Sequence, residues 1–445
     1  MREILRHSLR LLTLLLLAFV QFWMPCCQTV SAVDDSWQLY QDMIYYAVTP
    51  RNEVIIKSAR ASVTEAVLPA EIDGCPVTEI ASYAFKDCTR LTTVTLPETV
   101  QKIGAFAFKD CTRLENLTIP DTVGEIGWGA VLGTLWLKQR KENFVIAGQG
   151  ILLAYAGTDA QVTVPEGVRA IGGYAFNSCD MVETITLPST LVSIDAFAFD
   201  NCKGLRQITI PDGVETIGEY AFHWCISLRE IQLPDSVRSV DGHAFQFCKA
   251  LETVTLSNAM TQINNTLFQG CSSLVSVQIP DSVSVIYNYA FQNCTALKNV
   301  EIPASVTEIG SNVFDGCTAL EKLSILNPQC RIYDAERTIE KAANIYGMAE
   351  STAHVYAQKY TRAFVPMDRI RGDVDGDGKL TAQDAYEVLL LYAQMSVGTE
   401  AAWTDIQLYV ADYDENGIVD GTDAYEILVT YAKQSVSVQT NGEEK

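Results

Sequence analysis

The sequence predicts an α/β solenoid, in which short parallel strands are stacked and joined by short helical or 3-10 turns, followed by a small all-α domain. Two observations predict these two parts. A segment of 23 residues recurs along most of the 445-residue chain, and its phenylalanine returns at that spacing. Near the C-terminus, two acidic loops are each followed by nearly the same apolar segment. A fixed period this short is typical of a solenoid, because one such unit cannot bury its apolar face without neighbours.

Residues 1–32 have the pattern of a secretory signal peptide, with early arginines, a leucine-rich run and small residues before the expected cut after Ala32. A lipoprotein signal at Cys26 is the alternative, but the residues before it are not those of a lipobox. Cleavage removes three Arg and one Glu, a net +2, which moves the formal charge from −22 to −24. A chain this acidic excludes electrostatic nucleic-acid binding. No later stretch of about 18 apolar residues predicts a membrane span. We therefore expect a secreted, extracellular protein.

The repeat unit is represented by LRQITIPDGVETIGEYAFHWCIS, which spans Leu205 to Ser227. Its L-x-x-I-x-I alternation predicts a strand of about six residues with one buried face, and the following proline ends the strand. The apolar pair Val214 and Ile217 is expected to point back into the core. About ten such rungs, spaced by roughly 4.8 Å, would stack around one continuous core roughly 50 Å long. The repeated phenylalanines are Phe85, Phe108, Phe176, Phe199, Phe222, Phe245, Phe268, Phe291 and Phe314.

One column of the repeat predicts a left-handed backbone corner. It lies directly after the Ile217 position and mostly holds glycine, aspartate or asparagine, the residue types that tolerate a positive φ. Tyr287 falls in the same column and would then be strained. The A-F-x-x-C segment that follows predicts a short helical or 3-10 turn. The column contains Gly104, Gly127, Gly172, Asp195, Gly218, Asp241, Asn264 and Gly310.

Nine cysteines share another column. Adjacent rungs bring their Cα atoms into range for disulfide bonds in a secreted chain. The alternative is a ladder of small buried thiols, which we favour because free cysteine packs well where each rung needs one small residue. The column contains Cys88, Cys111, Cys179, Cys202, Cys225, Cys248, Cys271, Cys294 and Cys317.

The order of proline, V-x-x-I-G and A-F-x-x-C closely resembles the leucine-rich repeats of the bacterial surface-antigen type, often called BspA-like. The resemblance spans residues 45–364 and rests on many copies of the motif. It implies an α/β leucine-rich-repeat solenoid, expected with its terminal caps over residues 33–367. It also implies a secreted or cell-surface protein with a role in adhesion and recognition.

The period breaks between residues 136 and 181, where 45 residues stand in place of 23. Residues 144–157, FVIAGQGILLAYAG, predict a hairpin. Trp128, Trp136 and Tyr155 allow two interpretations, a ligand site or a variant rung that packs its own aromatic side chains into the core. We favour the core, because aromatic residues in apolar runs are mostly buried.

The exposed positions of the predicted strands form the face on which such a solenoid would bind. This face is polar and carries no aromatic side chain, which argues against tight carbohydrate binding, since sugar rings normally stack on Trp or Tyr. Its threonine columns are also good strand surface. The positions are Thr93/Thr95, Asn116/Thr118, Thr184/Thr186, Gln207/Thr209, Glu230/Gln232, Thr253/Thr255, Ser276/Gln278 and Asn299/Glu301.

Irregular segments are expected to close both ends of the solenoid. Residues 37–77 predict a first, irregular rung whose strands cover the open edge. The regular rungs are expected to end at residues 320–325. Residues 351–360 predict a short helix, with Ser351 as its N-cap, that covers the last rung.

Two acidic loops near the C-terminus match the calcium-loop pattern, which has oxygen ligands at positions 1, 3 and 5, glycine at 6, a backbone carbonyl at 7 and a carboxylate at 12. They are DVDGDGKLTAQD, residues 373–384, and DYDENGIVDGTD, residues 412–423, which begin 39 residues apart. They predict two Ca²⁺ ions, whose binding should be coupled to folding because the carboxylates would otherwise repel one another. The predicted ligands are Asp373, Asp375, Asp377, the Lys379 carbonyl and Asp384 for one ion, and Asp412, Asp414, Asn416, the Ile418 carbonyl and Asp423 for the other.

Each loop is followed by a near-identical apolar helix, DAYEVLLLYA or DAYEILVTYA. This duplicated loop and helix resembles a type I dockerin, a small all-α calcium-binding domain, here expected over residues 368–437 with a disordered tail at 438–445. The resemblance implies binding to a cohesin module of a scaffold protein in an extracellular polysaccharide-degrading complex. Many dockerins carry Ser-Thr at the paired recognition positions, and this chain does not. Those positions and their helix neighbours are Ala382, Gln383, Leu389 and Leu390, then Gly421, Thr422, Leu428 and Val429.

The sequence contains no H-E-x-x-H, G-x-S-x-G or phosphate-loop motif. The leading hypothesis is a non-catalytic recognition or adhesion subunit, docked by its C-terminal domain and presenting the solenoid to an unknown protein or glycan ligand. Two alternatives stay open. One is a polysaccharide-degrading, glycoside hydrolase-like enzyme whose acidic pair lies on separate rungs, and the other is a carbohydrate-binding component without catalysis.

Overall fold

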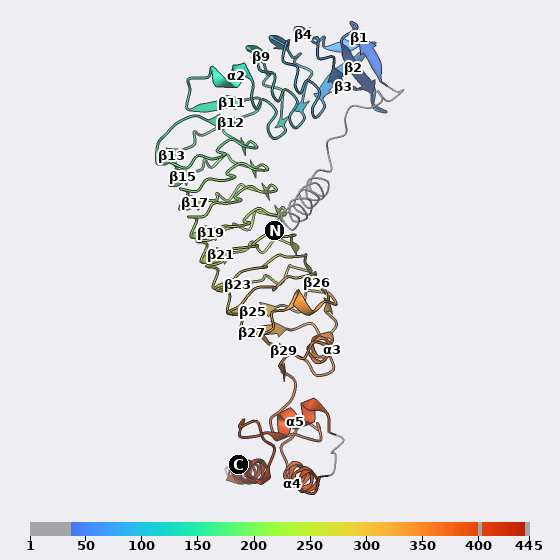
Figure 1. Cartoon of the computed structure of the whole chain (residues 1–445), viewed down its shortest axis with the longest axis vertical. Coiled ribbons are helices and arrows are strands. Elements are labelled where there is room, and N and C mark those ends of the chain that lie inside the picture. The colour runs from blue at the N-terminus through green and yellow to red at the C-terminus, as the bar shows by residue number, and fades with distance from the viewer. Residues whose placement is uncertain (1–36, 399–402, 441–445) are drawn as a thin grey trace, which may run out of the picture.

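The computed structural model describes residues 37–398 and 403–440. A long, curved solenoid is followed at its C-terminal end by a compact group of helices (Figure 1). The signal peptide expected at residues 1–32 lies outside the described residues. Within them, no helix combines the length and the apolar character needed to cross a membrane.

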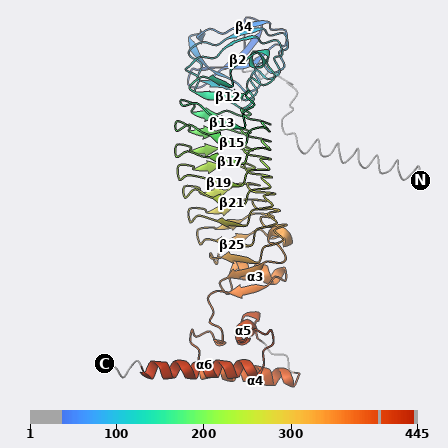
Figure 2. The same cartoon turned by 90° about the vertical axis from the view of Figure 1, so that its left-hand side faces the viewer.

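Successive rungs contribute strands to two parallel ladders, an outer ladder on the convex side of the curve and an inner ladder on the concave side (Figures 1 and 2). Strand pairing is interrupted twice in each ladder, between β9 and β13 and between β17 and β19 in the outer one, and between β10 and β12 and between β20 and β22 in the inner one. Paired residues are one repeat apart, as in Thr184 with Gln207. The outer ladder consists of β4 (Glu65–Val67), β7 (Thr93–Thr95), β9 (Asn116–Thr118), β13 (Gln161–Thr163), β15 (Thr184–Thr186), β17 (Gln207–Thr209), β19 (Glu230–Gln232), β21 (Thr253–Thr255), β23 (Ser276–Gln278), β25 (Asn299–Ile302), β27 (Lys322–Ile325), β29 (Asn344–Gly347) and β30 (Phe364–Pro366). The inner ladder consists of β3 (Val54–Ala59), β6 (Cys75–Ile80), β8 (Lys102–Ile103), β10 (Glu125–Ile126), β12 (Ile151–Tyr155), β14 (Ala170–Ile171), β16 (Ser193–Ile194), β18 (Thr216–Ile217), β20 (Ser239–Val240), β22 (Gln262–Ile263), β24 (Val285–Ile286), β26 (Glu308–Ile309) and β28 (Arg331–Ile332).

The stacked parallel strands are confirmed, but they are shorter than predicted. In the unit at residues 205–227 the outer strand β17 has three residues rather than about six. Val214 and Ile217 are buried as expected, and Ile217 also belongs to β18, so a second ladder forms where only core packing was predicted. The A-F-x-x-C segment is a hydrogen-bonded turn rather than a helix, with the Cys225 N–H donating to the Phe222 carbonyl (3.1 Å).

The left-handed corner does not lie in the column that the sequence predicted. No described member of that column, Tyr287 included, has a positive φ. Positive φ angles occur two and six positions later, as at Tyr220 (57°) and Trp224 (57°). The glycines instead permit a close approach between rungs, because a Cβ on Gly218 would lie 2.5 Å from the backbone nitrogen of Ala196. The predicted corner and the predicted strain at Tyr287 are therefore both wrong.

An insertion bends the solenoid and divides its core. The extra residues form α2 (Leu135–Lys138), β11 (Phe144–Ala147) and an antiparallel β11–β12 hairpin, which confirms the predicted hairpin. The flanking rungs still meet directly, since a Cβ on Gly173 would lie 2.2 Å from the Cβ of Trp128. The stack changes direction here (Figure 1). Buried apolar residues form two clusters that divide within β12, where Ile151 belongs to the first cluster and Leu152 to the second, so the expectation of one continuous core is wrong.

The two ends differ in how well the sequence predicted them. At the N-terminal end, β1 (Gln38–Tyr40) and β2 (Ile44–Val48) lie antiparallel beside β3, and β5 (Glu71–Ile72) pairs antiparallel with β6, so the irregular first rung is confirmed. At the other end, β29 and β30 extend the outer ladder past residue 325. The short η1 helix (Glu336–Thr338) precedes β29. The expected cap helix is α3 (Thr352–Lys359), whose N-cap Ser351 hydroxyl accepts the His354 N–H (3.3 Å).

Two of the buried side-chain columns in the core of the solenoid consist of phenylalanine and of cysteine. Phenylalanine rings of neighbouring rungs stack at centroid distances between 5.0 Å (Phe199 and Phe222) and 5.7 Å (Phe291 and Phe314). The cysteines of the described residues are free, and most thiols of the column donate to a carbonyl of the preceding rung, as Cys225 does to Phe199 (3.2 Å). The thiol ladder is therefore confirmed in preference to disulfide bonds.

Three helices make up the C-terminal module: α4 (Ala382–Ser396), α5 (Asp405–Ala411) and α6 (Gly421–Thr440). Helices α4 and α6 lie side by side at the far end of the molecule (Figures 1 and 2). A small apolar core, which includes Val388 and Ile427, holds them together. Helix α6 continues three residues past the boundary at 437 that the sequence predicted for this domain. Of the expected tail, residues 441–445 lie outside the described residues.

Candidate functional site

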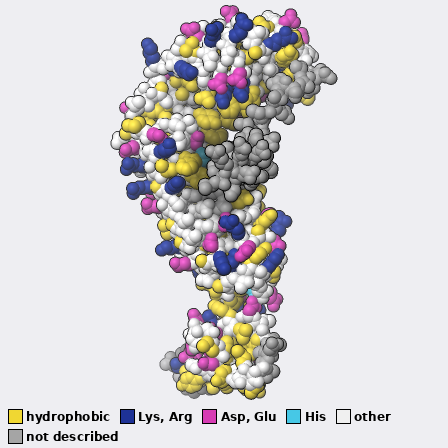
Figure 3. Space-filling view, in the orientation of Figure 1, with side chains coloured by type: hydrophobic (Ala, Val, Ile, Leu, Met, Phe, Trp, Pro, Cys, Tyr) yellow, Lys and Arg dark blue, Asp and Glu magenta, His cyan; other side chains and the backbone are white. Residues whose placement is uncertain are grey.

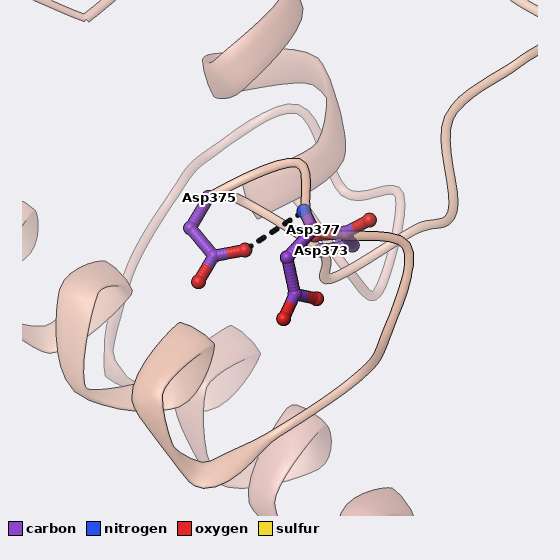
Figure 4. Close-up of side chains that lie close together, drawn as sticks. All are labelled: Asp373, Asp375 and Asp377. Atoms are coloured by element: carbon purple, nitrogen blue, oxygen red, sulfur yellow. Dashed lines mark hydrogen bonds between the residues drawn. The ribbon is translucent and has the colours of Figure 1, made fainter.

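The first acidic loop folds around the carboxylate of Asp373. Its Oδ1 accepts the backbone N–H groups of Gly376 (2.8 Å) and Asp377 (3.1 Å), and its Oδ2 accepts that of Gly378 (2.9 Å). Asp375 accepts the N–H of Asp377 (3.0 Å; Figure 4). At Gly378 φ is 83°, an angle that glycine adopts without strain, so the loop can turn sharply. The carboxylate oxygens of Asp373, Asp375 and Asp377 consequently lie within 4.8 Å of one another.

The second loop also brings three carboxylates together, but here the third one comes from the position-12 residue, Asp423. Oxygens of Asp412, Asp414 and Asp423 lie within 4.8 Å of one another. Asn416 lies beside them, and its Nδ2 donates to Asp414 Oδ2 (2.8 Å). Gly417, with φ of 84°, takes the place that Gly378 has in the first loop. Lys379 and Ile418, whose carbonyl oxygens were predicted as ligands, are the residues that follow these two glycines, and both side chains are exposed.

The position-12 carboxylates, Asp384 and Asp423, are fully buried at the starts of the long helices. Asp384 accepts the N–H groups of Val374 (3.0 Å) and Thr381 (2.8 Å) and forms a capping box with Thr381. Asp423 accepts the N–H of Tyr413 (2.7 Å). The structure thus brings together three of the four predicted carboxylates in the first loop, leaving Asp384 outside the group, and all three in the second.

In both loops, carboxylates lie close together and part of their negative charge has no partner in the described part of the chain. The Asp377 N–H lowers the pKa of Asp375, but burial and the carboxylates of Asp384, Asp377 and Asp373 outweigh it and raise this pKa above its ordinary value. In the second loop, Asp412 Oδ1 is buried and has no hydrogen-bond partner within the described residues. A divalent cation would give this oxygen a partner and offset the repulsion, and hard oxygen donors are the ligands that Ca²⁺ prefers. The residues present therefore fit one calcium ion in each loop.

The positions predicted to bind a partner lie on helices that bury only one side. Helix α4 buries Ala385, Val388 and Leu391, and α6 buries Ala424 and Ile427. Hydrophobic side chains are visible over this end of the molecule (Figure 3). The large exposed ones are Tyr386, Leu389, Leu390, Tyr392 and Met395 on α4, and Tyr425 and Leu428 on α6. Of the other predicted positions, Ala382, Gln383 and Thr422 are exposed, and Gly421 and Val429 are half-buried.

The first loop also faces the cap of the solenoid. A cavity of about 510 Å³ separates them, lined by His354 and Gln358 of α3 and by Asp373 and Asp375 of the loop. Asp405, at the start of α5, accepts Gln358 Nε2 (3.0 Å) and lies 3.1 Å from His354 Nε2. Partial burial raises the pKa of Asp405, but these hydrogen bonds outweigh it and hold the pKa below its ordinary value. The solenoid and the helical module are therefore joined by a polar link.

The repeats decide the family. Six copies of the BspA type leucine rich repeat region match residues 69–139, 155–275 and 262–336, which together exceed half of the chain. The chain belongs to the BspA-type leucine-rich repeat family. The unmatched residues 140–154 coincide with the insertion at the bend, and the helical module lies outside the matched residues.

Several solved structures of leucine-rich repeat proteins are similar to this chain. A leucine rich cell surface protein from Faecalibacterium prausnitzii is 24% identical, with 69% of this chain and 97% of that chain covered and a TM-score of 0.29. A leucine-rich repeat protein from Eubacterium ventriosum is 20% identical, with 63% and 88% covered and a TM-score of 0.33. The pneumococcal vaccine antigen PcpA is 14% identical, with 76% and 100% covered and a TM-score of 0.28. Among curated proteins there is no significant match.

Of the three aromatic residues considered for a ligand site, Trp136 and Tyr155 are buried in the core, as favoured. Trp128 is half-buried and belongs to an aromatic strip that the sequence analysis missed. Neighbouring rings of the strip are 4.4–6.1 Å apart, and hydrophobic side chains are visible on the inner side of the bend (Figure 3). The strip consists of Tyr83, Phe106, Trp128, Tyr174, Phe197, Tyr220 and His243. The signal that could have found the strip is a ring-bearing residue two positions after the glycine column, which holds for every member except Trp128, one position after Gly127.

Proposed function

We propose that this protein is a secreted, non-catalytic recognition protein whose solenoid presents a ligand-binding surface and whose helical module docks onto a cohesin-type partner when calcium is bound. The observation that carries the proposal is that each of the two acidic loops brings three carboxylates together beside helices with exposed apolar sides. Membership of the BspA-type family supports the recognition role, and the pattern of residues 1–32 supports secretion.

Calcium acts first in this proposal, because the loops set where the two long helices begin. Asp384 and Asp423 each belong to a predicted ligand set and also accept backbone N–H groups at a helix start. Binding an ion therefore fixes the loop and the helix that follows it. Without the ion, the crowded carboxylates favour an opened loop.

The docking surface consists of the exposed apolar sides of α4 and α6. Tyr386 and Leu389 on α4 correspond, one loop-to-loop interval later, to Tyr425 and Leu428 on α6, and all four are at least 47% exposed. Exposed apolar patches of this kind mark protein interaction sites in soluble proteins. The internal duplication gives the module a pseudo-two-fold, so a partner could engage either helix.

Calorimetric titration of the secreted full-length chain tests the proposal. We expect two calcium sites, cohesin binding that requires calcium, and loss of that binding in excess chelator. Asp414→Asn removes a converging carboxylate and should weaken one calcium site by at least about tenfold. Glu415→Gln, the adjacent exposed residue outside the converging group, is the matched control and should leave both sites unchanged. Undiminished cohesin binding in excess chelator would rule out calcium-dependent docking.

A further inference from the structure

A polar groove crosses the outer ladder near the C-terminal end of the solenoid. It has a volume of about 940 Å³ and lies over β23, β25 and β27. Gln278, Asn299 and Glu301 project into it from the exposed strand positions, and none of the three side chains has a hydrogen-bond or ion-pair partner within the described part of the chain. The groove is thus lined by donors and acceptors that the protein itself does not use.

One residue at the base of the groove is both buried and unpartnered. Ser324 is only 3% exposed and lines the groove, and its hydroxyl makes no hydrogen bond to any described residue. Beside it, the Lys322 ammonium is held 4.7 Å from the ring centroid of Tyr346, which fixes the position of this donor. Tyr346 pairs in register with Ser324 on the neighbouring strand, so this end of the outer face is not free of aromatic side chains. The sequence analysis missed Tyr346 because it ended the ladder at residues 320–325, before β29 and β30.

The residue types in the groove are not explained by strand stability. Several rungs carry threonine at both exposed positions of the outer strand, as at β7, β15 and β21, and threonine is favourable there. At β23, β25 and β27 the same positions carry Ser276, Gln278, Asn299, Glu301, Lys322 and Ser324. Asn, Glu and Lys are depleted in strands. Asn116, Glu230 and Gln232 occupy the same positions outside the groove. The feature specific to the groove is therefore that such residues line one hollow together on three adjacent rungs.

We propose that this groove binds a neutral glycan. This proposal rests on the recognition role proposed above, for which it names the ligand. The single Lys322 is outweighed by Asp281 and Glu301, so the groove has no excess of positive charge with which to hold a phosphate or a polyanion. Strands β23, β25 and β27 are paired on both sides, which leaves no free edge for an added peptide strand. Amide and hydroxyl groups both donate and accept, as sugar hydroxyls do, so they match such a ligand.

Affinity electrophoresis of the secreted full-length protein tests this assignment, with hydroxyethyl cellulose, xylan or glucomannan in the gel. We expect at least one of these neutral polysaccharides to retard the protein. Asn299→Ala and Gln278→Ala should each weaken the apparent affinity by about twofold to tenfold, the value of one lost hydrogen bond. Gln207→Ala is the matched control, because it lies in the same exposed column as Asn299 but outside the groove.

Three outcomes would overturn the glycan assignment: no retardation by any of the three polysaccharides, retardation that both groove variants leave unchanged, or retardation only by the polyanion polygalacturonate. Thermal melting of each variant checks that it is folded. Calcium and cohesin titrations on the same preparations keep the two proposals separable. Asn299→Ala should retain full cohesin binding. Loss of glycan binding with intact cohesin binding would therefore assign glycan binding to the groove and leave the docking proposal unaffected. Glycan binding without any cohesin binding would contradict the proposed docking role of the helical module and leave the glycan proposal unaffected.

Discussion

Asp195 occupies a position where the backbone of one rung closely approaches the next, and the corresponding residues of the neighbouring rungs are Gly172 and Gly218. Its carboxylate is half-buried and accepts the Ser193 hydroxyl (3.1 Å). Burial raises the pKa of Asp195 to about 6 from an ordinary value of 3.8. An aspartate with a raised pKa destabilises the folded state once it is ionised.

This carboxylate predicts a specific dependence of stability on pH. Below about pH 4 it is protonated in both the folded and the unfolded chain, and as the pH rises to about 6 the unfolded chain loses its proton first, so stability falls. The full effect would be roughly 3 kcal/mol, and screening of a half-buried group reduces it. We expect Asp195→Asn to raise the free energy of unfolding by about 1–2 kcal/mol at pH 7 and to change it little at pH 4.

The matched control for this substitution is Asp241→Asn. Asp241 falls in the same column and accepts a hydrogen bond from Ser239 (3.2 Å), but it is exposed. Denaturant unfolding at the two pH values should show a change below about 0.5 kcal/mol for the control. Equal gains for both variants would show that burial is not the cause.

Residue columns could be predicted from the sequence where one physical role explains the residue type. The phenylalanine and cysteine columns are of this kind, since each needs a buried side chain of fixed size, and both are buried as expected except at Cys179, which is half-buried. The glycine column was misinterpreted because glycine occurs both where φ is positive and where two backbones approach closely. Gly218 is of the second kind, since it lies against the backbone of the neighbouring rung. The sequence does not distinguish these two roles, because the aspartate and asparagine residues in the column also tolerate a positive φ.

At the scale of the element, the aromatic strip places bulky residues where the backbone disfavours them. Tyr174, Phe197 and Tyr220 have φ angles of 67°, 62° and 57°. A left-handed conformation costs roughly 1–2 kcal/mol per residue outside glycine. Their rings stack at 4.9 Å on successive rungs, and such contacts contribute about 0.5–1.5 kcal/mol each beyond area burial. Ring stacking between rungs therefore offsets much of the local strain.

The core phenylalanine column has no such conflict, and its truncation should be costly. Phe222 is fully buried between Phe199 (5.0 Å) and Phe245 (5.2 Å). We expect Phe222→Ala to lower the free energy of unfolding by about 3–5 kcal/mol and to loosen the adjacent rungs. Circular dichroism during denaturant unfolding measures this, with the exposed Gln207→Ala as control. A loss under about 1 kcal/mol would contradict the stacked-core interpretation.

The ends and the bend of the solenoid could be predicted only in part, because there the repeat no longer constrains the chain. The β11–β12 hairpin was predictable from its own apolar runs. The division of the core was not, because it depends on how Trp128 and Gly173 meet across the insertion. Strands β29 and β30 lack the repeat motif and join the ladder through backbone pairing, which leaves little trace in the sequence.

At the scale of the whole molecule, most of the carboxylates that converge in the two loops could be predicted from the loop motif, whereas the position of Asp384 outside its group and the surroundings of the loops could not. The local loop motif determines which carboxylates converge. The contact between the first loop and the solenoid cap joins residues far apart in the chain, such as His354 and Asp405. No periodicity or motif marks such a pair, so only the folded structure reveals it.

This contact determines how the module is held against the solenoid. Asp405 begins α5 and Asp412, a predicted calcium ligand, follows the same helix as its C-cap. Helix α5 therefore connects the link at His354 and Gln358 to the second loop. We expect Asp405→Ala to free the module from the cap without weakening calcium binding, because Asp405 is not one of the converging carboxylates.

Small-angle X-ray scattering of the full-length protein should show a larger radius of gyration for Asp405→Ala than for the parent. Because the pKa of Asp405 is lowered in the folded protein, the link contributes its stability above the ordinary aspartate value near 3.8 and loses it as the pH falls through the lowered pKa. Acidification of the parent protein through that range should therefore produce the same expansion, and the variant should not expand further. Glu426→Ala on α6, outside the cavity, is the control and should match the parent. An unchanged radius in Asp405→Ala would show that other contacts hold the module in place, and the link through α5 would not determine its position.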